Sequence, residues 1–285
     1  MTATAFDPVA YKETTREQWQ AAAAAWHRWG PTIGQWLGSA TELMLDMADI
    51  RVGSRVLDVA AGAGEQTIVA ARRIGATGHI IATDISSNLL EFAASAARQA
   101  GLATIETQVM DGENLDLEPD SFDAVISRVG LIYFPDRHKA LSGMRRALKP
   151  GGKLATIVYS TPEHNQFFSL PLAIIRRHAQ LPDPSPGQPG PFSLGGAGVL
   201  EAAYTRAGFR DVQTQVIDAP LRLSSTAEYL RFAQESWGAL HQMLAGLTEA
   251  ERQATWQEIE QALCAFEDPS GFEGPCELII GAGTK

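Results

Sequence analysis

The residues of this sequence that are best placed to do chemistry lie in VLDVAAGAG, at positions 56–64. An apolar run ends in Asp58, and the chain then passes through small residues as far as Gly64. Residues this small let backbone amides approach a ligand, and the amides at the start of a following helix favour electron-rich groups. The pattern predicts a ligand-binding turn between a strand and a helix.

A second acid completes this pattern. The apolar run HIIATD ends in Asp84, 20 residues after Gly64. An acid at the end of the second strand of such a unit can accept hydrogen bonds from both ribose hydroxyls of an adenosine. The spacing therefore predicts a nucleoside ligand.

Two kinds of nucleoside ligand fit, and the turn distinguishes them. A dinucleotide fingerprint needs a third glycine, and that position is Thr67. A carboxylate at Asp58 would repel a pyrophosphate but suits a positively charged amino group. The residues favour adenosine joined to an ammonium-bearing tail, a description that S-adenosylmethionine fits. An NAD-type oxidoreductase is the less favoured alternative.

Short apolar runs alternate with helical patterns over positions 54–160. We expect strands at 55–59, 78–83, 104–109, 122–127 and 153–159, and helices at about 65–75, 87–100 and 135–148. Strands that alternate with helices at this spacing form βαβ units and a parallel sheet covered on both faces. The predicted fold class is a doubly wound α/β fold.

The flanking segments have other patterns. Positions before 54 predict two helices that separate at Gly30-Pro31, and the proline- and glycine-rich stretch 182–197 predicts a loop or lid. After it we expect the following elements: a helix at 197–208, a strand at 211–218, two helices that begin near the capping-box spacings 225–228 and 248–251, and a strand at 277–282.

Residues 54–160 resemble the class I S-adenosylmethionine-dependent methyltransferases, in particular the branch that includes the ubiquinone/menaquinone-biosynthesis C-methyltransferases. Five segments carry the resemblance: VLDVAAGAG (56–64), ATDIS (82–86), MDGENL (110–115), FDAVISRVGLIYFPD (122–136) and LKPGGKL (148–154). They match the family's motifs in the family's order, which is more specific than any single motif.

The resemblance also implies roles for individual residues. It assigns ribose binding to Asp84, an apolar contact with adenine to Leu89, and hydrogen bonds with the adenine ring to Asp111 and Gly112. The cofactor-binding set that we predict is Asp58, Ala60, Gly62, Gly64, Asp84, Ile85, Leu89, Asp111, Gly112, Ser127 and Arg128. Ala60 replaces a glycine of the family motif, a mild departure if its φ is negative.

The family's fold implies a seven-stranded, mostly parallel, Rossmann-like sheet whose last strand is antiparallel, with helices on both faces. The segments near 211–218 and 277–282 would complete it. We expect three parts of one catalytic domain, namely a helical cap at 1–53, the cofactor-binding core at 54–160, and a substrate cap with the end of the sheet at 161–285. The cap would come from the N-terminus and the insertion at about 161–210.

Catalytic residues are less clearly marked. His164 follows the fifth strand and is the candidate general base, while Trp26, Tyr133 and Phe167 are candidates for the substrate pocket, with Trp36 and Phe168 as further aromatic candidates. The expected reaction is in-line transfer of a methyl group from S-adenosylmethionine to a small, partly apolar metabolite, with S-adenosylhomocysteine as product and C- or O-methylation favoured. A non-catalytic S-adenosylmethionine-binding regulatory protein is the alternative.

Composition narrows the choice of partner. The 285 residues include 23 Lys+Arg and 33 Asp+Glu, a formal charge of −10, which argues against a nucleic-acid partner and favours a small molecule. Cys264 and Cys276 have neither a zinc-site nor a CxxC spacing, so we expect no metal site and free thiols. With no run of 18 apolar residues and no leader pattern, we expect no membrane span and a cytoplasmic location.

Overall fold

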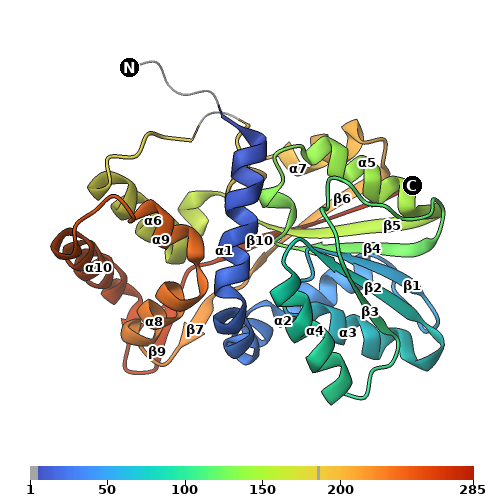
Figure 1. The fold of residues 1–285 in the computed structure, drawn as a ribbon, viewed down its shortest axis with the longest axis horizontal. Coiled ribbons are helices and arrows are strands. Elements are labelled where there is room, and N and C mark those ends of the chain that lie inside the picture. The colour runs from blue at the N-terminus through green and yellow to red at the C-terminus, as the bar shows by residue number, and fades with distance from the viewer. Residues whose placement is uncertain (1–5, 185–186) are drawn as a thin grey trace.

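The computed structural model describes residues 6–184 and 187–285 and is built on a seven-stranded sheet with helices on both faces (Figure 1). The strand order is β3-β2-β1-β4-β5-β10-β6. The strands are β1 (Arg55–Val59), β2 (His79–Asp84), β3 (Ile105–Val109), β4 (Phe122–Arg128), β5 (Leu148–Tyr159), β6 (Arg210–Asp218) and β10 (Glu277–Thr284). Strand β10 pairs antiparallel with both β5 and β6, which confirms the predicted fold class.

Helices α3 (Glu65–Ile74), α4 (Ser87–Gln99) and α5 (Arg137–Ala147) connect the parallel strands. Strand β1 is buried over its last four residues, as expected for an apolar run covered on both faces. Helix α4 begins at Ser86, whose hydroxyl accepts a hydrogen bond from the amide of Leu89. The strand order reverses between β1 and β4, and ligands of open α/β sheets bind at this reversal.

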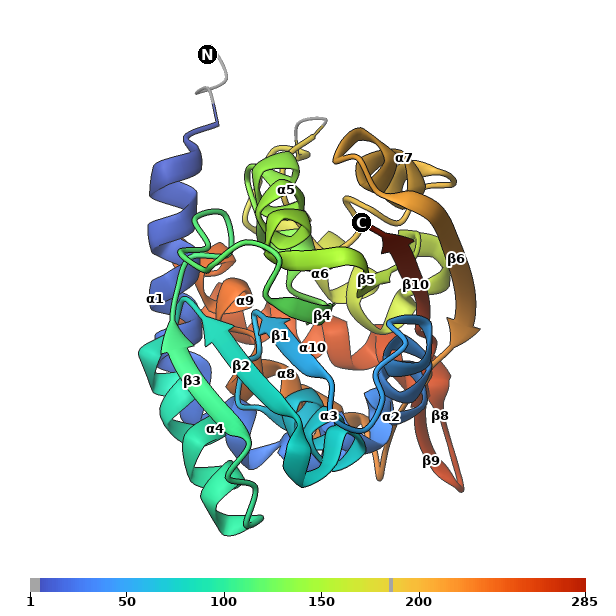
Figure 2. The same cartoon turned by 90° about the vertical axis from the view of Figure 1, so that its right-hand side faces the viewer.

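Two helices precede the sheet, and they separate at Gly30-Pro31 as predicted. Helix α1 (Pro8–Arg28) begins at Asp7, whose side chain accepts hydrogen bonds from two backbone amides of the first turn. It packs on α4 and runs along one face of the molecule, in the centre of the view in Figure 1 and at the left edge in Figure 2. Helix α2 (Gly30–Met47) packs instead against β4, β5 and β10.

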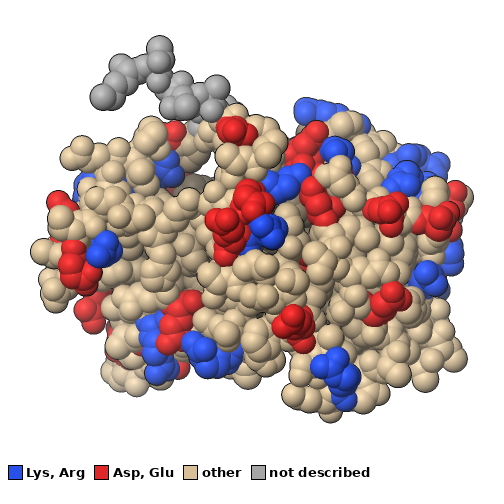
Figure 3. Space-filling model, in the orientation of Figure 1, with Lys and Arg blue, Asp and Glu red and all other residues tan. Residues whose placement is uncertain are grey.

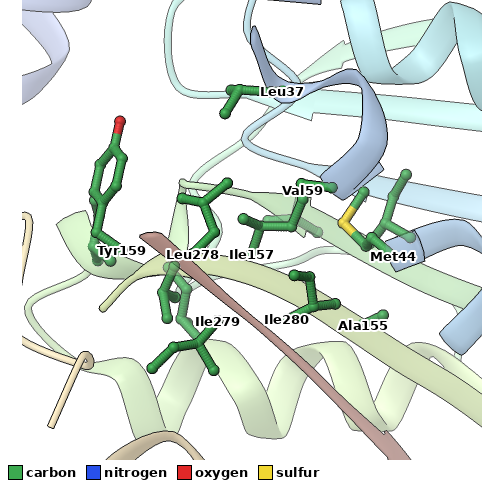
Figure 4. Close-up of a cluster of buried hydrophobic side chains, with 14 of the residues drawn as sticks. Leu37, Met44, Val59, Ala155, Ile157, Tyr159, Leu278, Ile279 and Ile280 are labelled. Carbon is green, nitrogen blue, oxygen red and sulfur yellow. The ribbon is translucent and has the colours of Figure 1, made fainter. Parts of the chain in front are cut away.

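The packing of α2 on the sheet forms part of the main core. Leu37 and Met44 of α2 lie near Val59 of β1 and Ile157 of β5 in Figure 4, and Leu278 of β10 joins the same cluster. Met44, Ile157 and Leu278 have no exposed surface. Truncating such a side chain to alanine costs about 2–5 kcal/mol of stability, so this cluster holds α2 in place over the sheet.

The C-terminal part adds helices and a second, small sheet. The helices are α6 (Gln166–His178), α7 (Val199–Arg206), α8 (Thr226–Ser236), α9 (Gly238–Met243) and α10 (Glu249–Leu263), and the small sheet has the order β7 (Leu221–Leu223), β9 (Gly271–Gly274), β8 (Glu267–Asp268). We predicted two helices after β6, and the described residues there form three. Helix α9 has only six residues, too few to show a helical period.

The proline-rich stretch 182–197 is a loop throughout its described part, while residues 185–186 lie outside the described residues, as do residues 1–5 of the N-terminal stretch. Cys264 is exposed and Cys276 is buried, and both are free thiols. Across 6–184 and 187–285, every helix is too short or too polar to cross a membrane. Within the same ranges, no cluster of histidine, cysteine and acidic side chains is suited to a metal ion.

Candidate ligand-binding site

A pocket opens at the carboxyl ends of the strands, around the reversal between β1 and β4. About 1100 Å³ of space between atoms belongs to it, a volume that includes open solvent at its mouth. The lining residues are Lys12, Thr15, Trp19, Trp26, Leu37, Ala60, Ala61, Gly62, Gln66, Asp84, Ile85, Leu89, Met110, Asp111, Gly112, Arg128, Val129, Gly130, Tyr133, Phe134, Pro135, Tyr159, Phe168 and Trp237.

The turn after β1 forms one wall. Gly62 and Gly64 have φ of +60° and +93°, values that glycine adopts without strain. Ala60 has φ of +59°, so the condition under which alanine would be a mild departure from the family glycine, a negative φ, is not met. Its methyl group is accommodated because Gly130 lies opposite, where an added Cβ would be 2.4 Å from the Ala60 Cβ.

Asp84 is 7% exposed and lies against this turn. Its Oδ2 accepts a hydrogen bond of 2.9 Å from the Gly62 amide, and its Oδ1 accepts one of 2.9 Å from the Ser86 amide. Burial raises the pKa of Asp84 above its ordinary value, and the two amides oppose the rise. Each oxygen keeps a further lone pair for a ligand hydroxyl.

Asp58 lies one layer deeper and is not among the lining residues. Its carboxylate accepts hydrogen bonds from Thr67 Oγ1 at 2.6 Å and from Gln66 Nε2 at 3.3 Å. Burial raises its pKa to about 6, and these two hydrogen bonds limit the rise. Asp58 therefore does not reach the pocket itself, whereas Gln66, which donates to it, does line the pocket.

Asp111 lies at the pocket edge and is bound to the N-terminal helix. Lys12 Nζ donates to Asp111 Oδ2 at 2.8 Å and to Glu113 Oε2 at 2.6 Å, and Asn114 also donates to Asp111. Burial alone would raise the pKa of Asp111, but the hydrogen bonds from Lys12, the Glu113 amide and Asn114 lower it. Gly112 lines the pocket beside it and lies against Phe134, on which an added Cβ would clash at 2.5 Å.

The pocket half beyond β4 is aromatic. Tyr159 and Phe168 come from β5 and α6, and Trp237 follows α8. Trp26 and Tyr133, two of the candidates for the substrate pocket, line this pocket together with Trp19, which packs on both at ring-centroid distances of 5.2 and 5.9 Å. Arg128 ends β4, lines the pocket at the border of this half and is 8% exposed.

Besides Asp58, five more predicted residues are not among the lining residues: Trp36, Gly64, Ser127, His164 and Phe167. Gly64 lies against Ala93, Ser127 lies behind Gly130, and Phe167 is fully buried against Trp36. His164 is turned away on the surface, its side chain 61% exposed, where Nδ1 is 2.8 Å from Glu277 Oε1. Ser127 belongs to a correctly predicted strand and His164 follows one, but neither side chain lines the pocket.

Sequence reasoning missed Lys12, Gln66, Tyr159 and Trp237. Lys12 meets Asp111 across 99 residues of chain, and Trp237 comes from the far C-terminal part, so no local spacing signals either contact. Gln66 lies two residues after the turn at 56–64, and Tyr159 is the last residue of the strand that we expected at 153–159. A signal was available there, because both are large polar side chains beside the carboxyl end of a strand.

On the face shown in Figure 3, Lys and Arg side chains are spread among acidic ones and form no continuous basic area. This distribution agrees with the formal charge of −10.

Comparisons with known proteins agree with this geometry. Residues 39–174 match the model of the ubiE/COQ5 methyltransferase family. The chain is 36% identical over 125 residues to the ubiquinone/menaquinone biosynthesis C-methyltransferase UbiE of Methylococcus capsulatus, an alignment that covers 44% of this chain and 50% of the relative. The chain thus spans about half the length of the curated relatives it matches. These matches confirm the resemblance seen in the motifs.

Solved structures confirm the fold. The YcgJ protein of Bacillus subtilis has a TM-score of 0.59 at 19% identity, over 87% of this chain and 98% of that one. Phosphoethanolamine N-methyltransferase 2 of Haemonchus contortus, solved with S-adenosyl-L-methionine, has a TM-score of 0.54 at 21% identity, over 87% of this chain and 52% of that one. At these identities the likeness concerns the fold alone.

Proposed function

We propose that this protein is an S-adenosylmethionine-dependent methyltransferase that acts on a small, partly apolar metabolite. The observation that carries the proposal is the pocket at the β1–β4 reversal, where the small-residue turn and Asp84 adjoin an aromatic chamber. The match of residues 39–174 to a methyltransferase family supports the same activity.

The residues over β1, β2 and β3 fit the cofactor. The free lone pairs of Asp84 suit the ribose hydroxyls, and Ile85, Leu89 and Met110 provide an apolar surface for the adenine. Asp111 and Gly112 line the pocket beside this surface, and we assign to them the contact with the edge of the adenine ring. Gln66, bonded to Asp58, is the polar side chain beside the turn that suits the amino-acid tail.

S-adenosylmethionine supplies a methyl group on a positively charged sulfur, which is a good leaving group for in-line displacement. The chain itself has to align the acceptor and exclude water, and orientation alone can contribute roughly 7–11 kcal/mol. Tyr133, Tyr159, Phe168 and Trp237 enclose the acceptor half. His164 is left out of the proposal because it lies outside that wall.

Binding of the cofactor is the first test. Asp84→Ala removes both acceptors for the ribose hydroxyls, so we expect the dissociation constant for S-adenosylmethionine to rise at least 10-fold in calorimetry. Asp218→Ala is the matched control, because Asp218 also ends a strand but is exposed at the end of β6, and it should bind normally. Equal affinity of wild type and Asp84→Ala would remove the ribose assignment.

The methyl acceptor can be identified by following a labelled methyl group from S-adenosylmethionine to its product. The protein is incubated with methyl-labelled S-adenosylmethionine and a metabolite extract, and labelled products are identified by mass spectrometry. We expect a labelled small molecule methylated on carbon or oxygen. Cofactor binding without any labelled product would favour a non-catalytic S-adenosylmethionine-binding protein.

We further propose that the segments 1–53, 54–160 and 161–285 act as one catalytic unit, since α1, α2, α6 and the residue Trp237 all contribute to the pocket wall. The two free thiols favour a reducing compartment, and we propose the cytoplasm.

A further inference from the structure

Arg128 has more hydrogen-bonding capacity than its surroundings use. It ends β4 and lines the pocket between the half over β1–β3 and the aromatic half. A guanidinium has five N–H donors. Within the described ranges its one hydrogen bond runs from Nη1 to Thr41 Oγ1, at 3.2 Å. A buried cation with unpaired donors at a pocket wall calls for an acceptor from a ligand.

The acid nearest to Arg128 balances its charge without occupying its donors. Glu65 Oε2 is 3.6 Å from Arg128 Nη2, too far for a hydrogen bond. That oxygen is buried and has no hydrogen-bond partner among the described residues. The negative charge of Glu65 therefore offsets part of the cost of burying the guanidinium. The N–H donors of Arg128 stay available for a second anion.

The backbone beside Arg128 is held in an unfavourable conformation. Val129 has φ of +59°, which is rare for a β-branched residue, and its amide donates to the carbonyl oxygen of Ile157 at 2.8 Å. Strain of this kind persists where the surrounding structure fixes it, and it gathers at binding sites. Here it brings Arg128, Val129 and Gly130 to the pocket wall together.

Tyr159 adds a second polar group on the next strand. It lies two residues past Ile157, the β-sheet partner of Arg128, and it lines the pocket. Its hydroxyl makes no hydrogen bond to any other described residue. Arg128 and Tyr159 thus present unused donors to one pocket, beside the aromatic side chains of Phe168 and Trp237.

We propose that Arg128, together with Tyr159, forms a carboxylate-binding site in this pocket. The planar fork of an arginine pairs with both oxygens of a carboxylate, and the surrounding apolar walls strengthen such a pair. The inference rests on the proposed function, because that function brings two possible sources of a carboxylate to this wall. One is the amino-acid tail of S-adenosylmethionine, and the other is an acceptor that is itself a carboxylic acid.

Calorimetry on Arg128→Met tests the first source. The ligands are S-adenosylhomocysteine and 5′-methylthioadenosine, which shares the nucleoside and the sulfur but lacks the amino-acid tail. If the tail supplies the carboxylate, Arg128→Met weakens S-adenosylhomocysteine binding about 10- to 100-fold and leaves 5′-methylthioadenosine unchanged. Arg128→Lys, which keeps the charge without the fork, should bind S-adenosylhomocysteine with intermediate affinity.

A second titration tests the acceptor source. Cinnamate and its neutral amide, cinnamamide, are titrated into protein saturated with S-adenosylhomocysteine. If the acceptor supplies the carboxylate, wild type prefers cinnamate about 10-fold or more, and Arg128→Met loses that preference while binding S-adenosylhomocysteine normally. Two results together overturn the proposal. Arg128→Met would bind S-adenosylhomocysteine as tightly as wild type does, and it would show the same ratio of cinnamate to cinnamamide affinity as wild type.

Two controls distinguish a failure of this proposal from unfolding of the variant and from a failure of the proposed function. Arg128→Met leaves Glu65 buried without a counter-charge, so the double variant Glu65→Gln/Arg128→Met is measured if the single variant unfolds. Wild type that binds neither S-adenosylhomocysteine nor 5′-methylthioadenosine would contradict the proposed function. The cinnamate titration on the protein alone then still decides whether Arg128 binds a carboxylate.

Discussion

At the scale of single residues, the contact between Ala60 and Gly130 shows how this chain departs from the family motif. A methyl group at Gly130 would be 2.4 Å from Ala60 Cβ and 2.9 Å from Ser127 Oγ. We expect Gly130→Ala to lower the free energy of unfolding by about 1–3 kcal/mol through overpacking. Adding Ala60→Gly should recover part of this loss, because it removes the nearer contact and suits the positive φ.

Urea unfolding of the two single variants and the double variant measures this coupling. Gly34→Ala is the matched control, since nothing lies within 4 Å of the added methyl group and alanine favours the helix, so stability should not fall. Strict additivity of the Ala60 and Gly130 substitutions would show that the two side chains do not meet.

Asp58 gives the fold a dependence on pH. Its pKa is raised to about 6 in the folded protein from an ordinary 3.8, so the folded state holds this proton more tightly than the unfolded chain does. The stabilisation from the protonated form is complete below about pH 4 and is lost as the pH rises through 6, a change of about 3 kcal/mol.

Asp58→Asn lacks this titration. The free energy of unfolding of the variant, relative to wild type, should therefore rise between pH 4 and pH 7.5 in urea titrations. The substituted amide side chain keeps one oxygen to accept from Thr67 or Gln66, so the pocket wall should hold. A difference between variant and wild type that stays constant over this range would contradict the assigned burial of the carboxylate.

At the scale of elements, α1 is held over the pocket by a few polar contacts. Lys12 binds Asp111 and Glu113, and Gln20 accepts hydrogen bonds from Ser86 and from the amide of Asn88. The Lys12 contacts are partly buried, and losing a contact worth about 1 kcal/mol raises the rate of local opening about fivefold.

Lys12→Gln should accordingly speed hydrogen exchange of the α1 amides by about that factor. Arg16→Gln is the control, because Arg16 pairs with Glu13 within the same helix on an exposed face and should leave exchange unchanged. Equal exchange in both variants would mean that the Lys12 contacts do not hold the helix.

The elements and the site differ in how far sequence predicts them. The strands and helices of 54–160 were predicted because buried parallel strands are continuous apolar runs, and the turn residues mark their ends. Asp84 was placed by a fixed spacing within one βαβ unit. Lys12 and Trp237 were not, because they reach the pocket through tertiary packing of distant segments, which no local period encodes.

Side-chain direction was the other source of error. His164 and Phe167 lie on the segment that follows β5, as expected, yet only Phe168 of that segment points into the pocket. Neighbouring helical residues differ by about 100° in direction, so a shift of one position in a predicted helix exchanges core for pocket. The short irregular segment that holds His164 has no repeating pattern of apolar residues, so the direction of its side chains cannot be predicted from the sequence.

At the scale of the whole molecule, β10 lies between β5 and β6 and pairs with both. A chain that ends at Pro275 would leave two buried strand edges without partners, and each unpaired buried backbone group is costly. We expect this truncated chain to show no cooperative thermal unfolding. A peptide of residues 276–285, added in trans, should restore it. A cooperative transition in the truncated chain alone would show that β10 is dispensable.

The position of β10 also has a consequence for biosynthesis. On a ribosome the five parallel strands from β1 to β5 leave the exit tunnel long before their antiparallel neighbour. Leu278 of β10 lies opposite Tyr159, so the aromatic wall is aligned only once that late segment has been translated. A nascent chain must therefore keep an open, aggregation-prone edge on β5 until β10 has been translated, and the ligand site stays incomplete for the same interval.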